Sequence, residues 1–454
     1  MAEILAVTDG PAGMRFSTIE LCRRLAGAGH TVTFAGEASA RGLVEHHGLG
    51  FRTLEPNGLK SFFEEDSTTG FPSRLRRLTE RRRAARAAVG IDRHAALLGE
   101  LRPDLVLIDG EMHEHIVASS AADVPVALLN TFCSIWRRTG SPPPHTSILP
   151  GVGWRGSRIG IALAWTAFGF RKRVRILRHR IRRVGCDRIS VLREIARDAG
   201  FDFDGEADPN QWLIPVTYPR FPALSLHAFE FEFPHEPAPS VRFVGPMVLE
   251  DRLDPPTPDA DRRRLDAVLD RRRRSGHEGA LLYAGFGSFF TAHRSWLRRL
   301  VDAVGLRPDW ELVLALGDGS DPAVLGGLPE GVHVFAWAPQ LEVLAHADAA
   351  VVHGGINTID ECVLAGVPML VSCGGETDMA GNTARVVYHG IGLAADPEED
   401  GTEQILDRLD RLLDDAVITG NLDRMGRTYR NYAERGEAER VVDDLLAGRL
   451  GPNP

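Results

Sequence analysis

The chain has almost no lysine, no closely spaced cysteines and no long apolar run. Lys60 and Lys172 are its only lysines, although Lys and Arg together number 53. The five cysteines stand far apart without the CxxC or Cys/His spacing of a metal site, so reduced thiols are expected rather than disulfides. The longest apolar run, 159–170, is well short of the roughly 20 residues that span a bilayer. These absences argue against a disulfide-stapled domain and against a membrane-spanning helix.

Net charge and chain length further limit the classes of protein to which the chain can belong. A formal net charge of −9 argues against nucleic acid as a partner, because general nucleic-acid binding needs a basic surface. A chain of 454 residues is too long for one ordinary core and fits two α/β domains of about 200 residues each. No basic stretch precedes the apolar segment 4–7, so no signal peptide is expected and a cytoplasmic location is predicted.

Apolar segments alternate with helical patterns in two separate series. The first series has expected strands at 4–7, 31–34, 105–108 and 126–129, and the second at 280–283, 311–315, 332–335, 349–352 and 369–372. Strand–helix–strand units imply parallel sheets. We predict two doubly wound domains, 1–235 and 259–430, joined by a proline-rich linker, 236–258, with a helix in 431–454 that packs back on the first domain. Their cleft is expected at the carboxyl edges of the sheets.

A strand, a glycine turn and a helix follow one another around His353. Gly354 and Gly355 separate the strand 349–352 from a helix that is expected to start near Asn357. Free N–H groups and the positive end of the helix dipole favour a phosphate there, and glycine lets it come close. Thr358 adds a donor. Such a turn alone is common in α/β proteins, so its neighbours decide the interpretation.

The residues before and after this turn in the sequence can bind the base, the ribose and the sugar of a nucleotide-sugar. Trp337 and Gln340 follow the strand 332–335, where an indole can stack on a base and an amide can pair with one. Glu361 lies one helical turn after Asn357 and can accept from ribose hydroxyls, unless it is a solvated carboxylate. Asp378 follows the strand 369–372 and can bind sugar hydroxyls, and Ser288 ends a tight loop that can hold phosphate.

The spacing of these residues resembles a known donor signature. Trp337-x-Pro339-Gln340, His353-x-Gly355-x-Asn357-Thr358-x-x-Glu361, Asp378 and Asn382 are similar to the UDP-glycosyltransferase-like family of inverting GT-B glycosyltransferases, of the bacterial natural-product type. Residues 134–200 match this family poorly.

The resemblance implies a fold, a reaction and a role for each residue. It implies two facing Rossmann-like domains that move a sugar from a UDP- or TDP-sugar to a small-molecule acceptor, with inversion and with no metal or resident cofactor. By the same resemblance Trp337 stacks on the base, Gln340 contacts base or ribose, and Glu361 takes the ribose hydroxyls. Asp378 holds the sugar, and the diphosphate is held at Gly355 by His353, Asn357, Thr358 and Ser288.

Two positions depart from the family pattern. Met379 stands where a sugar-binding glutamine is usual, which slightly favours a deoxysugar or an N-acetylated sugar. Met14 stands where the family usually has its histidine base, and a thioether cannot take a proton. Asp109, at the end of a strand, is our first candidate to replace it. The alternatives are His113 or His115, then Asp9, or an acceptor that is already an anion.

Two arginine-rich segments, 74–86 and 171–193, have more than one interpretation. Solvated helix faces explain them most simply. Alternatively, residues 159–193 contact anionic lipid or a lipid acceptor as an amphipathic element. Because of Met14, a non-catalytic nucleotide-sugar-binding partner of another enzyme is a further alternative, as is a nucleotide-sugar epimerase or hydrolase. The sequence does not indicate an oligomeric state.

Overall fold

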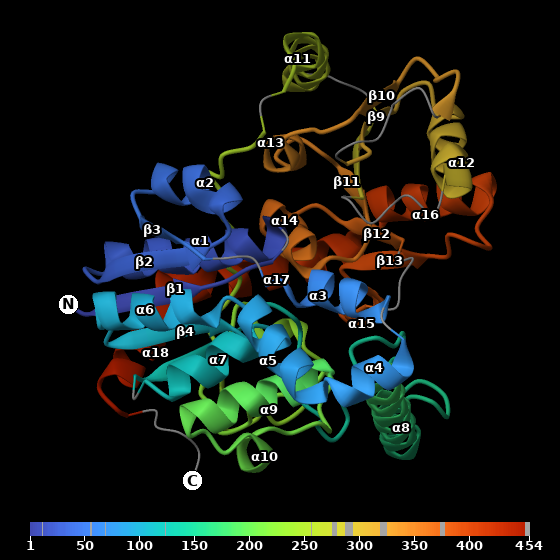
Figure 1. The fold of residues 1–454 in the computed structure, drawn as a ribbon. Helices are drawn as coiled ribbons and strands as arrows, with labels where there is room; N and C mark the ends of the chain where they lie inside the picture. The colour runs from blue at the N-terminus through green and yellow to red at the C-terminus, as the bar shows by residue number, and fades with distance from the viewer. Residues whose placement is uncertain are drawn as a thin grey trace.

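The computed structural model describes residues 1–10, 12–54, 57–68, 70–122, 124–255, 257–274, 279–286, 294–317, 325–372 and 377–449. Over these residues it has two α/β domains, each built on a parallel sheet (Figure 1). The predicted fold class is therefore confirmed.

The N-terminal domain has a seven-stranded sheet with the order β3-β2-β1-β4-β5-β6-β7. Its strands are β1 (Glu3–Val7), β2 (Thr31–Gly36), β3 (Gly50–Thr53), β4 (Leu105–Asp109), β5 (Val126–Asn130), β6 (Ala223–Ser225) and β7 (Val241–Phe243). Its helices are α1 (Ala12–Gly27), α2 (Arg41–His46), α3 (Leu59–Ser67), α4 (Phe71–Arg76), α5 (Leu78–Ala88), α6 (Ile91–Leu101), α7 (His113–Ser120), α8 (Arg158–Arg182), α9 (Arg188–Ala199) and α10 (Phe203–Glu206), with short 3-10 turns η1 (Ala38–Ala40) and η2 (Phe229–Phe231).

The C-terminal domain has a six-stranded sheet with the order β10-β9-β8-β11-β12-β13. Its strands are β8 (Leu281–Gly285), β9 (Glu311–Ala315), β10 (Val332–Phe335), β11 (Ala349–Val352), β12 (Met369–Ser372) and β13 (Gly392–Ala395). Its helices are α11 (Asp259–Arg273), α12 (Arg294–Gly305), α13 (Gln340–Leu344), α14 (Ile356–Ala365), α15 (Met379–Tyr388), α16 (Thr402–Asp414) and α17 (Ala416–Glu434). The last helix of the chain is α18 (Glu437–Leu446).

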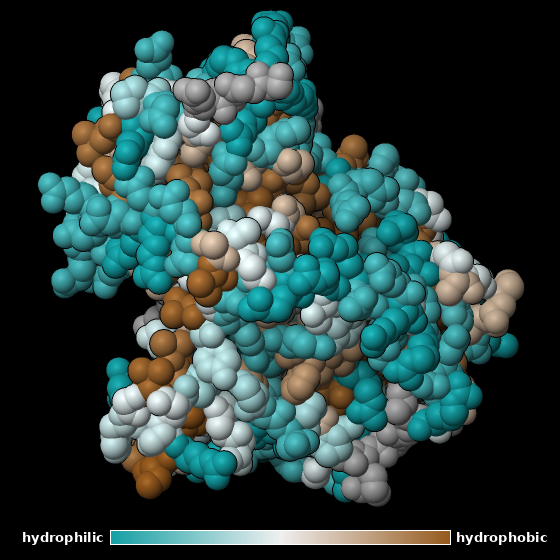
Figure 2. Space-filling model, turned by 180° about the vertical axis from the view of Figure 1, so that it is seen from behind, coloured by the Kyte–Doolittle hydropathy of each residue, from teal (hydrophilic) through white to brown (hydrophobic). Residues whose placement is uncertain are grey.

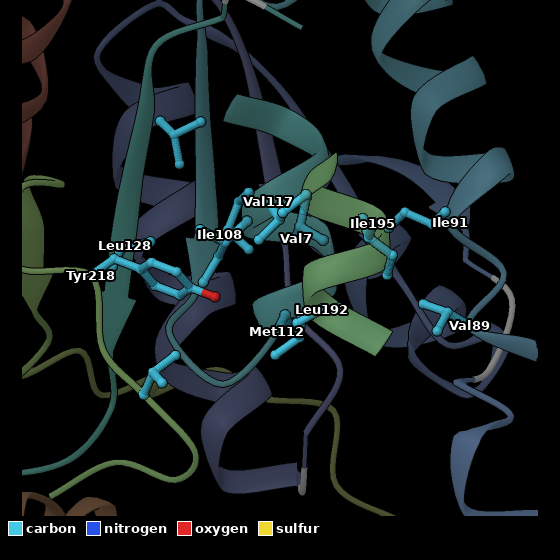
Figure 3. Packing of buried hydrophobic residues seen from close by; sticks show 14 of the residues in the cluster. Val7, Val89, Ile91, Ile108, Met112, Val117, Leu128, Leu192, Ile195 and Tyr218 are labelled. Atoms are coloured by element: carbon cyan, nitrogen blue, oxygen red, sulfur yellow. The ribbon is translucent and has the colours of Figure 1, made fainter. Parts of the chain in front are cut away.

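Successive residues of the central strands feed two separate cores. In β1, Leu5 and Val7 belong to one apolar cluster, whereas Ile4 and Ala6 belong to another on the opposite face of the sheet. Alternate side chains of a strand point to opposite faces of the sheet. Because helices cover both faces here, residues 4–7 of the strand are all apolar. Figure 3 shows the first cluster, in which Val7 lies among side chains of the sheet and of α7 and α9.

The last two helices belong to different domains. Leu422, Met425 and Tyr429 of α17 pack into the core of the C-terminal domain. After a turn at Gly436, α18 packs its apolar face against α1 and the N-terminal sheet, through Ala438, Val441, Val442 and Leu445. Figure 1 shows α18, in red, among the blue elements of the N-terminal domain. The chain therefore crosses between the domains a second time before it ends.

Within the described ranges, no helix is long and apolar enough to cross a membrane. This agrees with the short length of the apolar run seen in the sequence.

Candidate functional site

The turn between β11 and α14 has the backbone geometry that was expected of an anion site. Gly354 has a φ of +91°, which L side chains rarely adopt. Gly355 is the N-cap residue of α14, and a Cβ there would lie 2.6 Å from Nε2 of His353. Burial lowers the pKa of His353, although a hydrogen bond with the backbone of Gly285 opposes this. A neutral imidazole therefore stands beside the first N–H groups of α14.

A second loop braces this turn. Asn382, which is fully buried, donates from Nδ2 to the carbonyl oxygen of Gly354 (3.0 Å) and to Oδ2 of Asp378 (2.8 Å). Asp378 is the N-cap residue of α15, so this helix begins at Met379. Burial raises the pKa of Asp378, and the hydrogen bond from Asn382 opposes that shift. Asn382 thus joins the sugar-binding candidate Asp378 to the candidate phosphate-binding turn.

Gln340 and Glu361 lie together and bond to each other. Gln340, the first residue of α13, donates from Nε2 to Oε2 of Glu361 and, at 3.4 Å, to Oγ1 of Thr358. Its Oε1 accepts a hydrogen bond from the hydroxyl of Tyr283 on β8 (2.9 Å). Glu361 is only 7% exposed, so it is not a solvated helix carboxylate.

Arg252 is the partner that sequence reasoning missed. This linker residue donates from Nη1 to Oε1 of Glu361 at 2.7 Å, and its guanidinium lies 5.1 Å from the ring centroid of Phe16 on α1. Asp254 accepts from its Nε. Burial raises the pKa of Glu361, while Arg252 and Gln340 act in the opposite direction. No periodicity or motif marks Arg252, because its contacts join three distant segments.

Trp337 follows β10 and is half-buried, at the same carboxyl edge as His353. Met379 is 9% exposed beside Asp378. Ser288 lies outside the described residues.

The N-terminal domain faces this site. A Cβ at Gly13 would lie 3.1 Å from Nδ2 of Asn357, so the beginning of α1 approaches α14 closely. Glu111, which follows β4, is near enough to Asp378 for that carboxylate to contribute to its raised pKa, for which burial is the larger cause. The loops at the carboxyl ends of the two sheets therefore lie close together, where the cleft was predicted.

Asp109 is the last residue of β4 and lies at this edge. It is 3% exposed, and its carboxylate accepts from the backbone N–H of Glu111 (2.9 Å) and from Oγ1 of Thr8 (3.4 Å). Burial raises the pKa of Asp109 to about 7, against the effect of these hydrogen bonds. An aspartate with this pKa can exchange a proton near neutral pH.

The structure favours Asp109 over His113 and His115 as the base. His113 is fully buried on α7, packs against Tyr218 and has its pKa lowered to about 3 by burial. His115 is 4% exposed, stacks edge-on with His94 and has its pKa lowered to about 4, again mainly by burial. Both rings are about as buried as Asp109, but burial lowers their pKa values and makes them weak bases, whereas it raises the pKa of Asp109. His113 also lies 3.3 Å from the carbonyl oxygen of Ile214 through its Nε2.

Asp109 also lines an apolar pocket of the N-terminal domain. The pocket lies at the carboxyl ends of β4 and β5, and its aromatic walls are Phe132, Trp136 and Tyr218. Glu111 and Asn130 supply the polar groups near Asp109. In Figure 3 the ring of Tyr218 lies beside Leu128, which lines the same pocket.

Two buried ion pairs hold the domains together next to the cleft. Glu232 of the N-terminal domain accepts from Nε and Nη2 of Arg385 on α15 (3.0 and 2.6 Å), and Arg385 is fully buried. His227 lies 2.8 Å from Oδ2 of Asp360 on α14. Burial lowers the pKa of His227, but Asp360 outweighs this and the net shift is upward. The helices α14 and α15 that begin at the site are thus both anchored to the other domain.

No group of three or more His, Cys, Asp and Glu side chains that could hold a metal ion occurs in the part of the chain that the structure describes.

Comparison with known proteins agrees with this geometry. Residues 298–446 match a family model described as Erythromycin biosynthesis protein CIII-like, C-terminal domain. The oleandomycin glycosyltransferase of Streptomyces antibioticus is 31% identical over 175 residues, which cover 38% of this chain and 40% of that protein. The demethyllactenocin mycarosyltransferase of Streptomyces fradiae is 31% identical over 172 residues, which cover 38% and 36%. These matches span about two fifths of the length of those relatives.

Solved structures match along the whole chain. The glycotransferase of kitacinnamycin aligns with a TM-score of 0.66 at 22% identity, covering 99% of both chains. The calicheamicin glycosyltransferase aligns with a TM-score of 0.64 at 21% identity, covering 100% of both chains. The chain therefore has the GT-B fold, and the comparisons confirm its resemblance to the bacterial natural-product type of the UDP-glycosyltransferase-like family.

Proposed function

We propose that the protein is a glycosyltransferase that moves a sugar from a UDP- or TDP-sugar to a small-molecule acceptor, with inversion and without a metal ion. The observation that carries this proposal is the braced turn at His353, Gly354 and Gly355. Gly355 caps the N-terminus of α14, and Asn382 ties Gly354 to Asp378. The named relatives are glycosyltransferases, which supports the same reaction.

In the proposed reaction, an acceptor oxygen attacks the anomeric carbon on the side opposite the diphosphate. The bond from that carbon to the diphosphate oxygen breaks as the new bond forms. Negative charge then grows on the leaving diphosphate, where the N-terminus of α14 and the neutral His353 stabilise it by hydrogen bonds and by the helix dipole. These groups take the place of a metal ion.

Asp109 is the proposed base. It receives the proton that the acceptor loses, and its raised pKa suits this role near neutral pH. A small apolar pocket, lined in part by Phe132, Trp136 and Tyr218, lies beside this proposed base.

The donor site is tested by calorimetry with UDP and TDP on wild type and His353→Ala. We expect measurable affinity for one of them, and turnover that falls by roughly a hundredfold or more in the variant. His346→Ala is the matched control, since His346 precedes β11 and lies at the opposite edge of the sheet. Full activity of His353→Ala would refute the assignment of the phosphate site.

The reaction itself is tested by mass spectrometry over a panel of UDP- and TDP-sugars and small-molecule acceptors. Chelation should leave turnover unchanged, and NMR of the product should show an inverted anomeric centre. Tight donor binding without any product across a broad panel would instead identify a non-catalytic binding protein. Free or isomerised sugar formed without an acceptor would identify a hydrolase or an epimerase.

A further inference from the structure

The longest helix of the N-terminal domain, α8, carries a line of exposed apolar residues. Ile159, Leu163, Phe170, Leu177 and Ile181 have relative exposures of 69%, 49%, 69%, 56% and 65%. At 3.6 residues per turn they fall within roughly 40° of one line along the helix. We call these five residues the α8 stripe. The stripe lies nearly opposite the buried side of the helix.

The buried side of α8 explains why the stripe faces outward. Ile161 and Trp165 pack with Ile148 in a small core, and Trp165 donates from Nε1 to the carbonyl oxygen of Ser141 at 2.8 Å. Lys172 donates from Nζ to the carbonyl oxygen of Gln211 at 2.8 Å. These contacts fix the rotation of α8 about its axis. The α8 stripe therefore has a defined outward orientation.

The exposed apolar surface continues beyond the helix. Val152 and Trp154, in the loop just before α8, are 62% and 67% exposed. Phe71 and Leu75 of α4 are 56% and 55% exposed, and α4 touches the end of α8 because Arg74 donates to the carbonyl oxygen of Arg182. Figure 2 shows brown, hydrophobic atoms exposed at its lower left, where α8 lies in this view.

The charged residues of α8 and of the loop before it are all basic. Residues 124–186 contain no Asp or Glu at all, although the chain as a whole has a net charge of −9. By helical geometry Arg173 and Arg180 flank one side of the stripe, and Arg171 and Arg178 flank the other. An apolar line between two rows of cations is the pattern of a helix that lies in the interface of an anionic membrane.

We propose that α8 and the loop before it bind an anionic lipid surface. The stripe and Trp154 insert among the acyl chains near the headgroups, and the flanking arginines bind lipid phosphates. The stripe residues do not line the pocket beside Asp109, so this docking leaves the cleft free. The inference does not depend on the proposed transfer reaction.

Vesicle flotation of the full chain tests this proposal. Wild type should float with phosphatidylcholine vesicles that contain phosphatidylglycerol, and should bind much more weakly to phosphatidylcholine alone or at high salt. Combined Ile159→Ser, Leu163→Ser and Phe170→Ser should weaken binding at least tenfold. Leu306→Ser with Val417→Ser is the matched control, because these residues are 58% and 69% exposed elsewhere and their replacement should change nothing.

A second pair of variants isolates the charge. Arg178→Gln with Arg180→Gln should lower binding to anionic vesicles roughly tenfold and reduce its salt dependence, because each basic residue near the surface adds a separate increment. Arg263→Gln with Arg427→Gln, which removes the same charge from exposed positions outside α8, should not. Trp154→Phe should remove the blue shift of tryptophan fluorescence that wild type shows on binding.

Two results would overturn the proposal. One is a folded wild type, by circular dichroism, that binds neither vesicle, or that binds as well with the stripe variant as with its control. The other is self-association in light scattering that the stripe variant abolishes, without vesicle binding, which would assign this face to a second copy of the chain.

Discussion

At the scale of single residues, the burial of Asp109 makes both stability and activity depend on pH. Its folded pKa of about 7 lies above the ordinary value of 3.8, so the charged form costs stability in the folded protein. The favourable contribution is complete below the ordinary pKa and is lost as pH rises toward and through the folded value. A base must also be deprotonated to act. Activity is therefore expected to rise with pH in the range where stability falls.

Asp109→Asn separates these two effects. We expect kcat to fall by about 10²- to 10⁴-fold, because an amide cannot take the proton. The unfolding free energy at pH 8 should rise or stay constant, and its decrease between pH 4 and pH 8 should become smaller. Rates and denaturant unfolding across this range measure both. If the variant kept the wild-type rate and pH profile, Asp109 would not be the base.

A substitution at Gly355 tests whether His353 contacts the diphosphate. A methyl group there would meet Nε2 of His353 at 2.6 Å, while the φ of −65° suits alanine. Gly355→Ala should therefore fold normally and bind UDP or TDP about tenfold more weakly, because the imidazole must move away from the helix N-terminus. Gly99→Ala is the control, since a Cβ there meets nothing within 4 Å. Unchanged affinity would mean that the ring does not contact the diphosphate.

The sequence predicts the chemical role of single residues better than it predicts which residues surround them. The expected turn at Gly354 and Gly355 and the position of Asp109 at the end of a strand follow from local patterns that the chain adopts. The run His113-Glu114-His115 looks polar in the sequence, but the structure buries it, with Tyr218 against His113 and His94 against His115. Burial by distant segments leaves no signal in a local pattern.

At the scale of elements, the linker is more than a connection. Arg252 joins the linker to Phe16 of α1 and to Glu361 of α14. A proline-rich segment with little periodicity indicates a linker, but it does not indicate which residue reaches the opposite domain. The apolar run 159–170 and the first part of the arginine-rich segment 171–193 form one helix, α8.

Arg252→Met tests the role of this residue. Removing one partner of a buried ion pair leaves the Glu361 carboxylate with less compensation, so we expect a loss of about 3–5 kcal/mol in unfolding free energy. Donor affinity should also fall, because Arg252 no longer holds Glu361 in place beside Gln340. Gln340 in turn bonds Thr358. Arg427→Met on α17 should have little effect. A double-mutant cycle with Glu361→Gln measures the coupling, and a value near zero would contradict the ion pair.

At the scale of the whole molecule, buried polar groups join the two domains. Arg385 is fully buried and bonds Glu232 across the interface, next to Asp378. Such pairs are costly to break, and they fix one arrangement of the domains. No sequence pattern predicted this pair, since its partners are 153 residues apart.

Glu232→Gln should therefore destabilise the folded protein by about 3–5 kcal/mol, because Arg385 keeps its charge without a countercharge. Denaturant unfolding measures this loss, and the transition is expected to broaden or split as the domains unfold separately. Glu236→Gln, an exposed neighbour, is the control. A single transition at the wild-type midpoint would show that the pair does not couple the domains.

The return of α18 to the N-terminal domain has a consequence for recombination among relatives. The core around Ile4, Ile19 and Leu21 is completed by Val441 and Val442, which the ribosome adds long after the rest of that domain. A chimera that exchanges donor halves at the linker would pair a foreign helix with this core. Exchanges should instead use two crossover points, one near the linker and one near Gly436, so that α18 stays with its native partners.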